Sequence, residues 1–154
     1  MTDYHLPPSL HEYEASISAW LAGFAADNEV FEAIDRGEPG EAEPRWYVRL
    51  RGEEKEHHTV WLTLGQRTLR YEVYVLPAPI ENHAQVYEAA LRRNDKLVGA
   101  HFAIGVEDAL FLRGELPLTS LNEAELDRVI GSLYSYAEQA FPSLIRLAFA
   151  SKFT

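Results

Sequence analysis

Histidine and carboxylate side chains are the groups of this sequence that could act in catalysis or bind a metal. Two short stretches place such groups close together. "LHEYEA" (10–15) approaches the pattern of a zinc-binding helix, but Ala15 stands one turn after His11, where the second ligand would be needed. His57 and His58 are neighbours on an extended chain and point to opposite faces, so one ion would be poorly served by both. We expect this pair to lie in a solvated loop, and we predict no metal site.

The remaining candidates for catalysis lack partners. His101 alternates with Phe102, which favours a structural histidine on an open sheet face. Glu53 and Glu54 belong to a charged hairpin loop, where a solvated surface is expected rather than acid-base work. The sequence contains no nucleophile elbow, phosphate loop or dinucleotide fingerprint. We therefore predict no catalytic residue, no cofactor and no enzymatic activity.

Arg92 and Arg93 form the basic pair that most resembles a binding patch. They fall where a helix should end, and cations there complement the negative end of the helix dipole. Asn94 and Gly99 supply residues that commonly follow a helix. Two arginines rather than a longer run favour a helix end over a phosphate site.

Composition and net charge limit the classes of partner that the chain could bind. The chain has 154 residues, 47% of them hydrophobic, which suffices for one domain spanning 1–154. Its formal net charge is −10, with ten acidic residues and one basic residue in 1–44. This balance argues against binding to duplex DNA or to an anionic membrane. The lack of cysteine, of a signal-peptide pattern and of a long apolar helix predicts a cytoplasmic protein.

Periodicity predicts the elements that position these side chains. Ser9 and Glu12 form a capping-box pattern before a helix, 27–44 is an acidic, linker-like segment, and 28–35 is undecided between a longer helix and a turn. Alternation from Arg45 to Val75 predicts three antiparallel strands, followed by a helix at about 80–94. Two strands and a helix after a second capping box (Ser120, Glu123) complete the chain, and 142–154 is ambiguous. The order α-β-β-β-α-β-β-α indicates an α+β fold with an antiparallel sheet.

Two surfaces stand out as binding candidates. The first is the less apolar alternation of the first three strands, which has the residue types of interface hot spots: Tyr47, Arg49, Trp61, Arg70 and Tyr74. This face binds a partner, or else it lies under the second helix or in a dimer. The second is a stripe on that helix, which either joins two copies or covers the sheet: Val86, Tyr87, Ala90 and Leu91.

Four strings carry a family resemblance: "RWYVRLRG", "TVWLTLGQRTLRYEVYVLPAP", "LRRNDKLVGAHFAIGVEDALFLRGELPL" and "ELDRVIGSLYSY". Together they resemble the actinobacterial branch of the YbjN family over about 45–141. The resemblance implies a fold like that of type III secretion chaperones, which are small α+β proteins that usually dimerise and hold polypeptide clients without catalysis. It also implies a sensory or stress regulator, and it brings no catalytic or binding motif.

The leading hypothesis is thus a non-enzymatic, homodimeric protein-binding module, acting as a chaperone-like adapter or regulator on an unknown protein or peptide client. The alternative is a small-ligand sensor or enzyme that uses the open sheet face. Concavity distinguishes the two, because a closed pocket favours a ligand and an open surface favours a protein.

Overall fold

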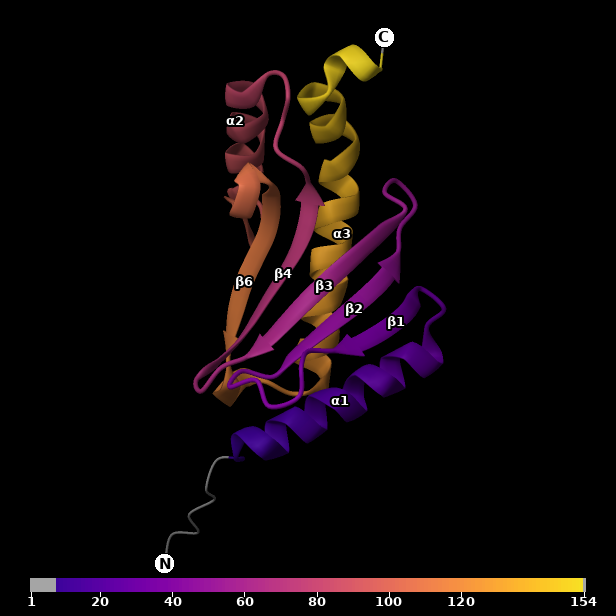
Figure 1. Ribbon diagram of the computed structural model, residues 1–154, viewed down its shortest axis with the longest axis vertical. Helices are drawn as coiled ribbons and strands as arrows, with labels where there is room; N and C mark the ends of the chain where they lie inside the picture. The colour runs from indigo at the N-terminus through magenta and orange to yellow at the C-terminus, as the bar shows by residue number, and fades with distance from the viewer. Residues whose placement is uncertain (1–7, 154) are drawn as a thin grey trace, which may run out of the picture.

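The computed structural model describes residues 8–153, which form three helices on one side of a six-stranded antiparallel sheet (Figure 1). The strands lie in the order β1-β2-β3-β4-β6-β5. The α+β class and the antiparallel sheet are confirmed, with one strand more than the sequence predicts. The main elements are α1 (Leu10–Asp27), β1 (Phe31–Arg36), β2 (Arg45–Arg51), β3 (His57–Leu64), β4 (Thr68–Leu76), α2 (His83–Asn94), β5 (His101–Ile104), β6 (Leu110–Pro117) and α3 (Glu123–Ala148).

The extra strand is β1, in the stretch that periodicity left undecided. It pairs with β2, and its register shifts between Phe31 and Ala33. The bulge breaks the alternation of buried and exposed side chains that would identify a strand in the sequence. Only the loop 37–44 therefore keeps the linker-like character that the sequence suggests for 27–44, and the observed order is α-β-β-β-β-α-β-β-α.

Strands β2, β3 and β4 confirm the period of two. On β2 the side chains of Trp46, Val48 and Leu50 are buried, whereas Arg45, Arg49 and Arg51 are exposed. The same alternation continues on β3 and β4, so one face of the sheet is apolar and the other is polar and aromatic.

Helix α1 begins and helix α2 ends as the local signals predict, whereas α2 begins at His83 and not at the predicted start near residue 80. Ser9 caps α1 by accepting a hydrogen bond from the backbone N–H of Glu12 (3.1 Å). Helix α2 starts at His83 and ends at Asn94, with Arg92 and Arg93 in its last turn. The prediction of a helix end is thus confirmed, and Gly99 has the positive φ (77°) that the following turn requires.

Helix α3 departs from the prediction at both ends. Its N-cap is Asn122, which accepts from the N–H of Glu125 (2.9 Å), so the predicted capping box at Ser120 is wrong and Ser120 ends a 3₁₀ turn. The helix also continues past Pro142 to Ala148. Proline removes one backbone hydrogen bond, but buried Leu144 and Ala148 extend the apolar stripe beyond it. Packing therefore outweighs the local break.

The core lies between the apolar sheet face and the helices. Helix α3 runs behind the sheet in the view of Figure 1. It packs against β3 and β4, while α2 packs against α3 and β5. Helix α1 joins this side as well, since Ser18 accepts a hydrogen bond from the indole N–H of buried Trp46 (3.1 Å). The other sheet face is left without a covering helix in the described part of the chain.

Candidate functional site

The uncovered sheet face carries all five residues that the sequence selected, so their common face is confirmed while their binding role stays a prediction. Two of them form an aromatic pair in the middle of the sheet: the rings of Tyr47 and Trp61 meet edge-on with centroids 5.8 Å apart. Trp61 is 42% exposed although it lies on an interior strand. Such an exposed, firmly supported aromatic side chain is typical of interface anchors.

Three arginines of this face have carboxylate partners. Arg70 lies 2.7 Å from Glu43 of the β1–β2 loop, and Arg113 of β6 lies 2.6 Å from Glu72. A third pair joins Arg49 to Glu32 of β1 (3.5 Å), at a distance from the other two pairs. These exposed pairs hold the guanidinium groups in place while leaving them open to solvent.

A broad, open hollow of about 770 Å³ lies beside the aromatic pair. It collects three of the predicted residues (Tyr47, Trp61 and Arg70) together with Arg113 and His101. Two predicted residues are not in its lining: Arg49, and Tyr74, whose ring packs edge-on against Phe111 at 5.6 Å. The hollow therefore occupies only part of the predicted face and extends beyond it toward β6 and β5.

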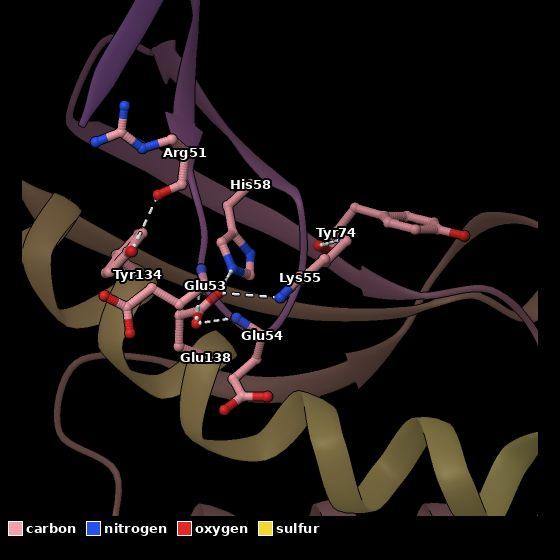
Figure 2. A network of polar contacts seen from close by, with 8 residues as sticks. All are labelled: Arg51, Glu53, Glu54, Lys55, His58, Tyr74, Tyr134 and Glu138. Carbon is pink, nitrogen blue, oxygen red and sulfur yellow. Dashed lines mark hydrogen bonds and ion pairs between the residues drawn. The ribbon is translucent and has the colours of Figure 1, made fainter. Parts of the chain in front are cut away.

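The covered face holds a polar network that the sequence analysis missed (Figure 2). His58 is completely buried, and its Nε2 donates to Oε1 of Glu138 at 2.5 Å. The same carboxylate accepts from the backbone N–H groups of Glu54 (2.8 Å), Glu53 (3.2 Å) and Lys55 (3.4 Å). Glu138 of α3 thus clamps the β2–β3 hairpin loop onto the helix.

Two neighbours complete this network. The ring of Tyr134 meets His58 edge-on at 5.5 Å, and its hydroxyl donates to the carbonyl of Arg51 (3.0 Å). The Lys55 ammonium donates to the carbonyl of Tyr74 (2.9 Å) (Figure 2). Hairpin, helix and sheet are therefore held together at one place.

Burial and hydrogen bonding shift the charges of this network. Burial lowers the pKa of His58 more than its bond to Glu138 raises it. Burial alone would raise the pKa of Glu138, but hydrogen bonds from the Glu54 N–H, from His58 and from the other two N–H groups lower it overall. Burial also lowers the pKa of Lys55 to about 8, against the opposing charge of Glu138. The network is thus a neutral histidine on an ionised carboxylate.

The expectation of a solvated His57–His58 loop is wrong. Both residues begin β3, where neighbouring side chains do point to opposite faces as predicted. His57 lies 3.3 Å from Glu32, and His58 enters the core. Since Glu138 is 80 residues away, no local signal could have revealed this partner. Glu53 and Glu54 side chains are exposed, as predicted, and only their backbone joins the network.

The predicted stripe on α2 divides between two environments. Val86 and Ala90 are buried against the rest of the chain, whereas Leu91 is 65% exposed. Leu91, Tyr87 and Ile104 line a small apolar hollow of about 180 Å³ beside the outer edge of β5. Val86 and Ala90 therefore help to cover the core, and only Tyr87 and Leu91 are available for contact with a partner.

Residues 8–153 contain neither a candidate metal cluster nor a helix that could span a membrane. Among these residues no three histidine, aspartate or glutamate side chains gather into a possible metal site. Within the same part of the chain, no helix is long and apolar enough to cross a bilayer.

The fold and the open face together define a class of protein: a small α+β protein with helices on one side of an antiparallel sheet and an uncovered aromatic face on the other. The chain belongs to the YbjN family, described as "Putative bacterial sensory transduction regulator", which matches residues 17–146. The predicted family is thus confirmed.

Two mycobacterial relatives support this family assignment. The chain is 34% identical over 113 residues to the uncharacterised protein Rv0487 of Mycobacterium tuberculosis, covering 73% of this chain and 62% of that protein. It is 32% identical to the Mycobacterium leprae protein ML2442, covering 70% and 58% of the two chains. The chain thus spans about 60% of the length of these relatives.

The fold is similar to that of the Yersinia pestis type III secretion chaperone SycH, solved in complex with a stable fragment of YscM2. The TM-score is 0.50, at 21% identity over 80% of this chain and 98% of that chain. This likeness confirms the chaperone-like fold that the sequence predicts.

Proposed function

We propose that this protein is a non-enzymatic adapter of the YbjN family that binds another protein through the open sheet face. One observation carries the proposal: an exposed tryptophan, Trp61, stands with Tyr47 at the centre of a sheet face that no described helix covers. Apolar and aromatic surface of this kind is stabilised when a partner removes it from water.

The shape of the site supports a protein partner over a small molecule. The hollow of about 770 Å³ opens broadly to solvent, whereas pockets for small ligands usually bury most of the ligand surface. The titratable network that could tune a proton transfer, His58 with Glu138, lies on the covered face and outside the lining of the hollow. The fold adds support, since the SycH structure was solved with a protein fragment bound.

A pair of variants tests this function. Trp61→Ala combined with Arg70→Glu should remove the native partners from an affinity pull-down, while circular dichroism and oligomeric size stay unchanged. The matched control is Arg36→Glu, because Arg36 of β1 is also exposed and ion-paired (2.5 Å to Glu14 of α1), but it lies outside the lining of the hollow. Full recovery of every partner by the double variant would rule out the open face as the binding surface.

We further propose a homodimer that uses the exposed half of the α2 stripe. Leu91 (65% exposed) and Ile104 (51% exposed) flank the small apolar hollow, and the outer edge of β5 has no neighbouring strand in the described chain. A second copy would cover all three features at once. Light scattering at tens of micromolar should show a dimer, and Leu91→Asp should shift it to monomer. A wild-type monomer at that concentration would contradict the dimer.

A further inference from the structure

The loop 37–44 brings a carboxylate to the rim of the open-face hollow. Its sequence, "GEPGEAEP", contains three glutamates, and the third, Glu43, lies 2.7 Å from Nη2 of Arg70. The loop is fixed beside the sheet because the N–H of Leu64 donates to the carbonyl of Pro44 (2.9 Å). An acidic segment of this chain therefore already occupies one of the guanidinium groups that face the hollow.

The lining of the hollow carries one more arginine than glutamate, in a chain that is acidic as a whole. Its lining contains three arginines (Arg45, Arg70 and Arg113) and two glutamates (Glu72 and Glu115), in a protein of formal net charge −10. Glu72 is engaged by Arg113 at 2.6 Å. Arg45 forms no ion pair within residues 8–153. One guanidinium group is thus open to a carboxylate, and a second is held by the loop.

The contact between Glu43 and Arg70 is exchangeable. The side chains are 44% and 51% exposed, and an ion pair in such a setting is weak because water screens both charges. A carboxylate from another chain can therefore replace Glu43 with little loss. The neighbouring Trp61 and Tyr47 rings offer the apolar contact that a peptide aromatic side chain would need.

We propose that the open face selects acidic polypeptide segments that also carry an aromatic residue, and that Glu43 competes with such a segment for Arg70. This inference rests on the protein-binding function proposed above and adds the chemistry of the partner. In the free protein Glu43 of this loop occupies Arg70, and it weakens partner binding until an acidic segment of higher affinity displaces it.

Three blocked, fluorescein-labelled nonapeptides test this chemistry by anisotropy: one alternates glutamate with tyrosine, the second replaces every glutamate with glutamine, and the third replaces every glutamate with lysine. We expect the glutamate peptide to bind about tenfold more tightly than the glutamine peptide, and the lysine peptide to bind more weakly than both. Added salt should reduce the difference.

Two substitutions test the competition. Glu43→Gln should tighten binding of the glutamate peptide about threefold, because Arg70 no longer has a charged partner within the chain. Arg70→Glu should weaken it at least about tenfold. The matched control is Glu14→Gln, which removes the equivalent carboxylate from Arg36, outside the lining of the hollow, and should leave peptide affinity unchanged.

The outcomes separate this inference from the function beneath it. Equal or tighter binding of the lysine peptide, or no tightening by Glu43→Gln, would overturn the inference, even if the Trp61/Arg70 double variant still lost its native partners. Peptide results as expected would support it. If the double variant then recovered every native partner, the proposed function would fall while the preference for acidic segments stood.

Discussion

The two faces of the sheet carry the same kinds of side chains in opposite settings. Each face has a tryptophan on a neighbouring strand: Trp46 is completely buried on the covered face, and Trp61 is 42% exposed on the open one. Each also has a glutamate that holds a cationic or polar partner from a distant part of the chain: Glu138 binds His58, and Glu43 binds Arg70. The side chains are of similar kinds, and the two faces differ in their access to water.

This difference teaches what each face does. Where water is excluded, a carboxylate must have all its hydrogen bonds, and Glu138 accepts four from the hairpin and His58. Where water is present, the pair of Glu43 and Arg70 contributes little to stability and can exchange partners. The covered face therefore maintains the fold, and the open face remains available for binding.

The largest expected effect contrasts the two tryptophans. Trp46→Ala should lower the free energy of unfolding by about 4 kcal/mol, because it leaves a cavity and removes one of the two donors to the Ser18 hydroxyl. Trp61→Ala should lower it by less than about 1 kcal/mol, since the ring is already partly in water. Urea denaturation followed by circular dichroism measures both. Similar losses for the two variants would contradict the contrast.

The next contrast concerns the two glutamates. Glu138→Ala should cost about 3 kcal/mol, since it leaves buried His58 and three backbone N–H groups without their acceptor. Glu43→Ala should cost less than about 0.5 kcal/mol, because its ion pair with Arg70 is exposed. Equilibrium unfolding in urea decides the matter. A loss on removing Glu43 as large as that on removing Glu138 would show that the open-face pair is structural.

The pH dependence of stability sharpens the comparison further. The pKa values of His58 and Glu138 are both lowered in the folded protein, so below the ordinary values of 6.5 and 4.5 the unfolded chain binds more protons. Their stabilisation is complete above about pH 6.5 and is lost as the pH falls through the two folded pKa values. The urea concentration at the unfolding midpoint should therefore fall as the pH is lowered from 7 to 4. The fall should be shallower in His58→Gln, which removes the titrating imidazole, and should match the wild type in Glu43→Gln, because Glu43 lies outside the network; an equal slope in all three proteins would contradict this assignment.

The smallest effect is a change in the reactivity of one amine. Because burial lowers the pKa of Lys55 to about 8, its neutral form is abundant at mildly alkaline pH. Its rate of carbamoylation by cyanate, followed by mass spectrometry, should show a midpoint near pH 8. A blocked lysine peptide, whose amine has the ordinary pKa of 10.5, serves as the comparison. A Lys55 profile that coincides with that of the peptide would contradict the lowered pKa.

Local signals in the sequence predicted much of the fold because they depend on near neighbours. The period of two from Trp46 to Val75 assigned three strands and both of their faces, and Ser9 and Arg92–Arg93 marked helix ends. The five candidate residues of the open face share that face for the same reason: their side chains alternate with a buried apolar series. Periodicity alone thus found the surface, though not its hollow.

Two elements depended on the tertiary structure. Strand β1 has a bulge that hides its alternation, and it exists because β2 offers an edge with which to pair. Helix α3 passes through Pro142 because Leu144 and Ala148 are buried beyond it. Tertiary contacts outweighed local preference in both places.

The decisive pairings were likewise set by the fold. His58 meets Glu138 across 80 residues, and Arg70 meets Glu43 across 27. No spacing in the sequence links such partners, because their distance is determined by how strands and helices pack. The sequence by itself determined which side chains share a face; only the folded chain decided which of them lie in water and which carboxylate each one meets, since burial and pairing arise when distant segments come together.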